Sequence, residues 1–116
     1  MGRVVYFEVT ADDLERAAGF YAKAFGWRSE NSPFAEGYKL ADTGEGSGIN
    51  GAIMQRTFQA QPTIVWIQVH DIDAAIEGVR DAGGSTVNEK STIPGEGQVA
   101  YVRDTEGNLL GLKQPR

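Results

Sequence analysis

The sequence predicts an α+β fold made of two copies of one strand–helix–strand–strand–strand (βαβββ) module. Two stretches, at residues 4–27 and 63–84, share a strand-then-helix plan, and the segments that follow them match each other. A chain of 116 residues is long enough for one modest core. We therefore expect one domain, with module one at 1–56, a linker at 57–62 and module two at 63–116.

The first module opens with a strand and a helix. Side chains alternate between an apolar and a mixed face over Val4–Val9, which is typical of a strand. The short oxygen-bearing side chains in Thr10–Asp13 favour a helix start, because they accept hydrogen bonds from free backbone N–H groups. Apolar residues at helical spacing from Leu14 to Phe25 form one stripe, and Gly26 predicts the helix end.

The second module repeats this beginning. Thr63–Val69 alternates in the same way, and Asp71 is placed to cap a helix that ends at Gly83–Gly84. Two alignments relate the modules: Val4–Val9 with Ile64–Val69 for the strands, and Asp13–Ala17 with Asp71–Ala75 for the helices. Their offsets along the chain differ by two residues.

The remaining strands follow in the same order in both modules. Tyr38–Ala41 and Val99–Arg103 each run into a turn that starts with aspartate, and residues 48–55 (GINGAIMQ) align with 107–114 (GNLLGLKQ) without a gap. Trp27–Glu30 and Thr86–Glu89 are the expected second strands of the two modules.

Two segments are rich in glycine. Residues 93–98 (IPGEGQ) are not a phosphate-binding loop, because they lack the terminal Gly-Lys-Ser/Thr and open no helix. Like residues 44–48 (GEGSG), they can act either as a flap over a ligand or as a hairpin connection. The sequence leaves both readings open.

Composition excludes several classes of protein. The net charge of −5 argues against nucleic acid as a partner, since binding it needs clustered Lys and Arg. The absence of cysteine excludes disulfides and thiolate chemistry. No apolar run approaches the ~20 residues that span a bilayer, and the start of the chain does not resemble a signal peptide. We expect a cytoplasmic protein with no membrane partner.

Three segments together resemble one family: residues 7–27 (FEVTADDLERAAGFYAKAFGW), 69–84 (VHDIDAAIEGVRDAGG) and 93–115 (IPGEGQVAYVRDTEGNLLGLKQP). This is the vicinal oxygen chelate superfamily, which includes glyoxalase I, extradiol dioxygenases and bleomycin-resistance proteins. The resemblance implies that the two modules curl into a cup-shaped mixed sheet with the helices outside. It also implies a homodimer.

The resemblance implies a test for a metal site. Metal-dependent members place one His, Gln or Glu on the first and last strand of each module. By register, these positions here hold residues without a donor atom: Val4, Ala52, Ile64 and Gly111. Sliding the register brings in Tyr6, Met54, Trp66 and Lys113, or Glu8 and Gln68 at strand ends, and neither set assembles three ligands. We predict no metal and no other cofactor.

The cup-facing side of the strands supplies the candidate ligand-binding residues: Tyr6, Glu8, Asn50, Met54, Trp66, Gln68, Tyr101, Arg103 and Lys113. Aromatic side chains among them can form the walls of a small-molecule pocket, and the polar ones can orient a ligand. Two simpler interpretations remain open. Tyr6 and Trp66 can be core residues, and Glu8 can pair with Arg103 or Lys113.

Three functions compete. The resemblance to bleomycin-resistance proteins implies a metal-free protein that binds a small organic molecule, an antibiotic being one candidate. The second function is a metal-independent lyase or isomerase in which Glu8 is the candidate catalytic residue, with Tyr101 or His70 as a partner. The third is a metal-dependent glyoxalase or dioxygenase, against which the ligand positions argue. The expected partners are a small molecule and a second copy of the chain.

Overall fold

A computed structural model describes residues 2–57 and 59–116 of the chain, so residue 58 of the predicted linker lies outside the described residues. The chain divides into two compact units. The N-terminal unit is Tyr6–Thr63, and the C-terminal unit is Ile64–Arg116 together with the start of the chain up to Val5. No helix within the described residues is long and apolar enough to cross a membrane.

The elements of the N-terminal unit appear in the predicted order: β1 (Arg3–Ala11), α1 (Leu14–Phe25), β2 (Arg28–Asn31), β3 (Tyr38–Asp42) and β4 (Gly51–Gln55). Strand β1 pairs with β4 in parallel, and β3 pairs with both β4 and β2 in antiparallel fashion. The predicted strand at Trp27–Glu30 is thus shifted by one residue. Tyr38–Ala41 is a strand as predicted, and the strand predicted at Val4–Val9 extends by one residue at its start and by two at its end.

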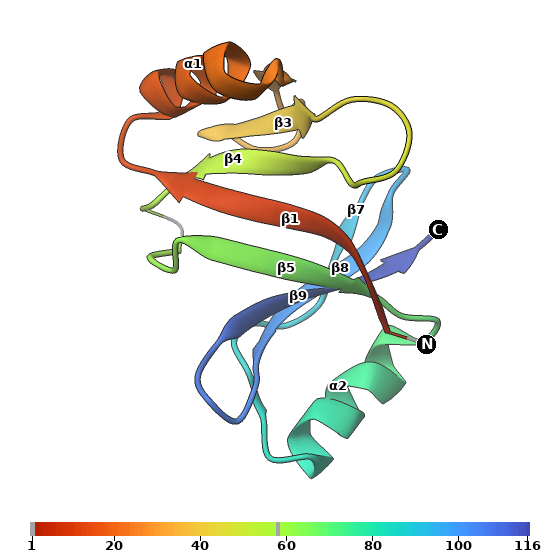
Figure 1. The fold of residues 1–116 in the computed structure, drawn as a ribbon. Helices are drawn as coiled ribbons and strands as arrows, with labels where there is room; N and C mark the ends of the chain where they lie inside the picture. The colour runs from red at the N-terminus through yellow and green to blue at the C-terminus, as the bar shows by residue number, and fades with distance from the viewer. Residues whose placement is uncertain (1, 58) are drawn as a thin grey trace. The chain divides into compact units, whose positions relative to one another are not determined.

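Helix α1 begins and ends where its capping residues predict. The Asp13 side chain accepts a hydrogen bond from the Arg16 backbone N–H at 3.0 Å, and Gly26 ends the helix at φ 74°. Helix α1 lies over β3 and β4 (Figure 1), where its apolar stripe packs on Ala11, Ala41 and Ile53. One face of this sheet is therefore covered by the helix. The other face, which carries Glu8, points away from it.

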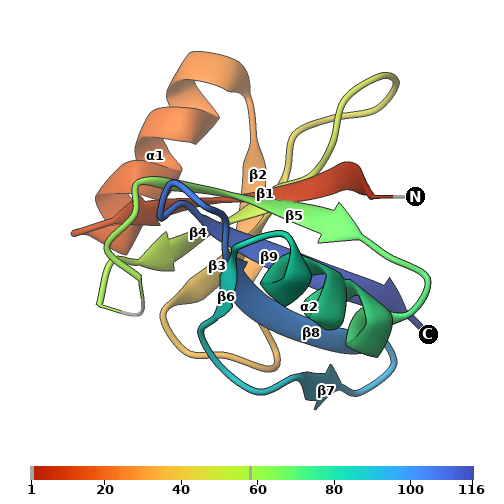
Figure 2. The same ribbon diagram turned by 90° about the horizontal axis from the view of Figure 1, so that it is seen from below.

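The C-terminal unit contains β5 (Thr63–Gln68), α2 (Ile72–Asp81), β6 (Ser85–Thr86), β7 (Ser91–Ile93), β8 (Gly97–Arg103) and β9 (Leu109–Pro115). Strand β9 pairs in parallel with β5 and in antiparallel fashion with β8. Helix α2 lies across β8 and β9 (Figure 2) and packs on a core that includes Ile72, Val102 and Leu112. The α+β class and the repeated strand–helix plan are confirmed.

One sequence prediction in this unit was wrong in detail, and the structure decides between the two readings of a second segment. The strand expected at Thr86–Glu89 is only Ser85–Thr86, because the residues that follow are exposed and offer no apolar alternation. The segment Ile93–Gln98 is a tight hairpin between β7 and β8, closed by the Glu96 N–H, which donates to the Ile93 carbonyl at 2.9 Å. Of the two readings of this glycine-rich segment, the hairpin connection is the correct one.

Strand pairing also corrects the alignment of the two modules. Glu8 lies opposite Ala52 in β4, and Trp66 lies opposite Gly111 in β9. Since Ala52 and Gly111 align in the matching tails, Glu8 is the equivalent of Trp66. The equivalent of Ile64 is therefore Tyr6 rather than Val4. The strand offset now equals the helix offset, so the two-residue difference was an error of strand register.

The turn after β8 is organised by one carboxylate. Asp104 Oδ1 accepts from the backbone N–H groups of Glu106 (2.8 Å) and Asn108 (2.9 Å), and Oδ2 accepts from the Asn108 side-chain amide at 3.0 Å. The Asn108 side chain and backbone N–H hold the pKa of Asp104 below its ordinary value of 3.8, because they bind the charged form.

We expect Asp104→Asn to lower the melting temperature at neutral pH by a few degrees. A carboxyl whose pKa is lower in the folded state stabilises the fold above its ordinary value of 3.8, and this contribution is lost as the pH falls through the folded-state value. The difference between the variant and the wild type should therefore disappear in acid. Thermal unfolding at neutral and acidic pH measures it, with the exposed Glu89→Gln as control. A difference that persists unchanged in acid would contradict this account.

Candidate functional site

A pocket of about 480 Å³ lies within the N-terminal unit. It is lined by Tyr6, Arg28, Ser29, Glu30, Leu40, Ala41, Asp42, Asn50 and Gly51. Leu40 and Asp42 alternate in β3 with Ala41, which belongs to the core under α1, so their side chains lie on the sheet face that the helix leaves uncovered. Arg28 lies directly opposite Asp42, and Glu30 opposite Leu40, which places both on this face.

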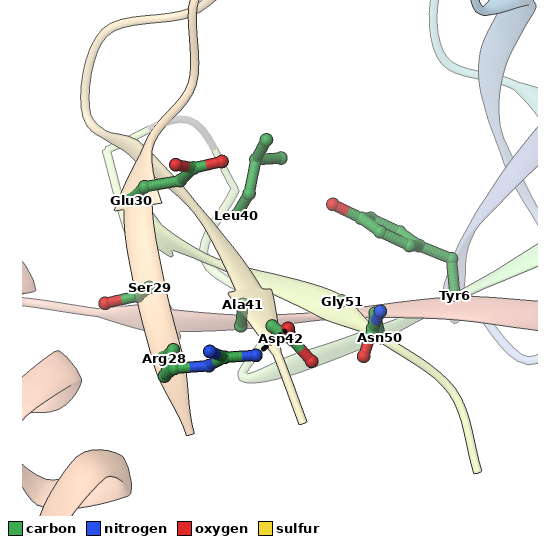
Figure 3. Close-up of a pocket in the computed structure, with 9 residues that line it drawn as sticks. All are labelled: Tyr6, Arg28, Ser29, Glu30, Leu40, Ala41, Asp42, Asn50 and Gly51. Carbon is green, nitrogen blue, oxygen red and sulfur yellow. Dashed lines mark hydrogen bonds and ion pairs between the residues drawn. The ribbon is translucent and has the colours of Figure 1, made fainter. Parts of the chain in front are cut away.

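Polar groups of both charges surround this pocket (Figure 3). The Arg28 guanidinium pairs with the Asp42 carboxylate at 2.9 Å, and Asn50 is held by the Thr43 N–H, which donates to its Oδ1 at 2.9 Å. In Figure 3 the Tyr6 hydroxyl points across the pocket toward Leu40. An aromatic wall, an aliphatic contact and a few oriented polar groups suit a small organic molecule.

A buried carboxylate lies on the same sheet face. Glu8 is 1% exposed, and the Tyr38 hydroxyl donates to its Oε2 at 2.6 Å. The Tyr38 hydroxyl is also 3.4 Å from that of Tyr6. Burial, and next the charge of Glu8, raise the pKa of Tyr38 far above its ordinary range. Tyr38 therefore remains a neutral hydrogen-bond donor to this carboxylate.

We expect Tyr38→Phe to weaken the alkaline loss of stability. A group with a raised folded-state pKa contributes stability below its ordinary value, 10.0 for tyrosine, and loses it as the pH rises above that value. In the wild type, unfolding above pH 10 releases the Tyr38 proton; in the variant it does not. Urea unfolding at neutral pH and above pH 10 measures this, with Tyr21→Phe, on the helix-covered face of the same sheet, as control. Equal alkaline slopes for Tyr38→Phe and the wild type would contradict the prediction.

The predicted site residues of the N-terminal unit fall into three positions. Tyr6 and Asn50 line the pocket, and Met54 is buried opposite Tyr38 in the β3–β4 pairing. Glu8 accepts from the Tyr38 hydroxyl, which is also the one that lies near the Tyr6 hydroxyl. The structure thus brings Tyr6 and Glu8 together through a third residue, Tyr38.

In the C-terminal unit, Trp66 is 7% exposed and its ring centroid lies 5.0 Å from that of Tyr101. Gln68 lies opposite Lys113 in the β5–β9 pairing, and Lys113 in turn pairs with Glu96 at 3.4 Å. Arg103 donates to the Gly107 carbonyl at 3.0 Å. His70 is exposed just before α2.

The residues at the superfamily's ligand positions do not fit a metal ion. With the corrected register these positions hold Tyr6, Ala52, Ile64 and Gly111. Ala52 and Ile64 have no donor atom, and a Cβ built on Gly111 would overlap the Trp66 indole, so the space for a ligating side chain is already filled. In the described part of the chain, no three His, Cys, Asp or Glu side chains gather around a common point.

Sequence reasoning missed Tyr38, together with Arg28 and Leu40. The signal was present, because the alternation in the third strand places Tyr38, Leu40 and Asp42 on one face. It was applied to the matching strand of the second module, where it gave Tyr101 and Arg103, and not to this one.

The comparison that decides the family covers nearly the whole chain. The family model of the glyoxalase/bleomycin resistance protein/dioxygenase superfamily matches residues 3–112. The chain belongs to this superfamily. One similar protein is the probable lactoylglutathione lyase of Vibrio parahaemolyticus, which is 27% identical to this chain over 97% of this chain and 91% of the lyase. A glyoxylase-like domain-containing protein of Didymella fabae is also 27% identical, over 96% and 92% of the two chains.

Solved structures of low identity share the superfamily fold with this chain. Methylmalonyl-CoA epimerase from Mycobacterium tuberculosis superposes with a TM-score of 0.69 at 18% identity, over 97% of this chain and 87% of the epimerase. A hypothetical protein from Bacillus halodurans gives a TM-score of 0.72 at 16% identity, over 99% and 95% of the two chains. At these identities the likeness establishes the fold alone.

Proposed function

We propose that this superfamily member is a metal-independent lyase or isomerase that moves a proton on a small organic molecule, with Glu8 as the base. One observation carries the proposal: the Glu8 carboxylate is almost fully buried and receives a 2.6 Å hydrogen bond from Tyr38. Burying a carboxylate is costly unless it is hydrogen-bonded, and such groups concentrate at functional sites. The adjacent pocket offers a ligand-sized space on the same sheet face.

The names of two similar proteins support the class of reaction. Lactoylglutathione and methylmalonyl-CoA are both acyl thioesters, which carry an acidic hydrogen on the carbon next to the carbonyl. A carboxylate base can remove this hydrogen, and general acid–base catalysis of this kind contributes about 10²- to 10⁴-fold to a rate. An α-acidic carbonyl compound is therefore the substrate class that we propose for this chain.

A second candidate function is to bind a small molecule without changing it, as the resemblance to bleomycin-resistance proteins implies. The composition of the pocket favours it, because Arg28, Asp42, Glu30 and Asn50 give hydrogen-bonding groups of both polarities around an open space. Such a protein would hold a small organic molecule, such as an antibiotic, and release it unchanged.

The test follows one hydrogen. The purified protein, dialysed against a strong chelator, is incubated in D₂O with S-lactoylglutathione or methylmalonyl-CoA, and proton NMR follows the loss of the hydrogen next to the carbonyl. Loss of this hydrogen faster than with heat-denatured protein supports the lyase or isomerase function. Saturable binding of these probes without exchange favours the binding protein. Exchange that needs an added metal ion would overturn the metal-independent mechanism.

A further inference from the structure

We propose that the Tyr6 and Tyr38 hydroxyls form a proton relay between the pocket of the N-terminal unit and the buried carboxylate of Glu8. The inference rests on the proposed function and adds the route by which the base reaches its substrate. Its basis is a chain of contacts: Tyr6 lines the pocket, its hydroxyl is 3.4 Å from that of Tyr38, and Tyr38 donates to Glu8 at 2.6 Å.

Glu8 needs such a route because it does not line this pocket. Its side chain is 1% exposed, and neither Glu8 nor Tyr38 is among the residues that form the pocket wall. Tyr6 belongs to both groups, since its ring forms part of the wall and its hydroxyl lies next to Tyr38. A ligand in the pocket therefore meets the Tyr6 hydroxyl before it meets any atom of Glu8.

The relay balances in protons and charge. The ligand gives the hydrogen next to its carbonyl to the Tyr6 oxygen as a proton, and the C–H electron pair stays on the ligand as an enolate. At the same time Tyr6 passes its own proton to the Tyr38 oxygen, and Tyr38 passes its proton to Glu8 Oε2. Glu8 becomes a neutral acid and both tyrosines are neutral again. Running the relay backward returns a proton to the ligand.

Two properties of the cluster agree with a concerted transfer. The pKa of Tyr38 is strongly raised by burial and by the charge of Glu8, so a stepwise route through a Tyr38 tyrosinate is disfavoured. The Tyr6–Tyr38 separation of 3.4 Å is longer than an ordinary O–H···O bond, and a shift of about 0.5 Å brings it into range. Tyr6 is the residue that a bound ligand can press toward Tyr38.

The first test needs no ligand. The Tyr38 hydroxyl proton, held in a 2.6 Å hydrogen bond, should give a far-downfield NMR resonance that is absent from Tyr38→Phe. Because the relay connects this proton to the pocket through Tyr6, Tyr6→Phe should slow its exchange with water about fivefold, the factor for one hydrogen bond of ordinary strength. Tyr21→Phe, on the helix-covered face of the same sheet, should leave the exchange rate unchanged. An unchanged rate in Tyr6→Phe, or no such resonance in the wild type, overturns the relay.

The second test uses the deuterium-exchange assay with S-lactoylglutathione. We expect Tyr6→Phe, with an unchanged circular dichroism spectrum, to lose about 100-fold in rate. Full activity in Tyr6→Phe together with none in Glu8→Gln would mean that Glu8 acts directly, which overturns the relay and leaves the proposed function standing. If the wild type exchanges no hydrogen, the proposed function fails on this probe, and the NMR experiment still decides whether the hydroxyl chain conducts protons. If Tyr6→Phe does not fold, the exchange rate of the wild type is measured in mixtures of H₂O and D₂O. A curved dependence of this rate on the deuterium fraction of the solvent supports the relay, and a linear dependence contradicts it.

Discussion

Gly111→Ala should lower the free energy of unfolding by about 3 kcal/mol, at the upper end of the cost of inserting one methyl group into a packed core. Gly111 lies opposite Trp66 in the β5–β9 pairing, and a Cβ at this position would overlap the indole ring. Trp66 has little room to withdraw, because it is 7% exposed and its ring lies against Tyr101. Urea denaturation of the variant and the wild type measures the difference.

A matched glycine and a second substitution sharpen this test. Gly78 lies inside α2 with open space where its Cβ would be, so Gly78→Ala should stabilise the fold by about 0.5–1 kcal/mol through helix propensity. Trp66→Leu should rescue part of the Gly111→Ala loss, giving a favourable coupling in the double-mutant cycle. Equal effects of Gly111→Ala in the presence and absence of Trp66 would show that the indole is not the obstacle.

Glu8→Gln should reduce the rate of deuterium exchange on S-lactoylglutathione by about 10²- to 10⁴-fold, the usual contribution of a general base. The amide keeps an oxygen that can accept the hydrogen bond from Tyr38, so the fold should survive while the proton acceptor is lost. The exchange assay gives the rate, and thermal unfolding shows whether the fold is intact.

The control for this variant is Glu36→Gln, which makes the same chemical change at an exposed position between β2 and β3 of the same unit, outside the pocket wall. It should leave the exchange rate as it is in the wild type. A Glu8→Gln protein that is folded and fully active would remove Glu8 as the base and would favour the second candidate, binding without chemistry.

Local chemistry explains most of what could be predicted from the sequence. Asp13 and Asp71 have the short acceptor side chains that cap helices, and the structure shows both in that role. The strand register was harder. A pattern that repeats every two residues looks the same after a slide of two, so alternation alone could not choose between Val4 and Tyr6 as the equivalent of Ile64. Backbone pairing makes the choice, and it is not visible in one sequence.

In the candidate site, too, local features could be predicted and contacts between distant strands could not. Glu8 could be singled out because it is a charged residue in an apolar strand. Tyr38 could not be linked to it from the sequence, since 30 residues separate them and only the β1–β4–β3 order of pairing brings the two strands near each other. Contacts between distant strands depend on sheet order, for which composition and spacing give no local signal.

The packing of Trp66 on Gly111 also bears on how this sequence can change over evolution. A ligating side chain at position 111 has no room until residue 66 becomes small, and shrinking a buried tryptophan first leaves a cavity that costs about 3–5 kcal/mol. Either substitution alone is therefore damaging, although the pair together restores the space. A metal-binding descendant of this chain can therefore arise only through a destabilised single variant. This makes the change difficult, even though metal-binding relatives share the fold.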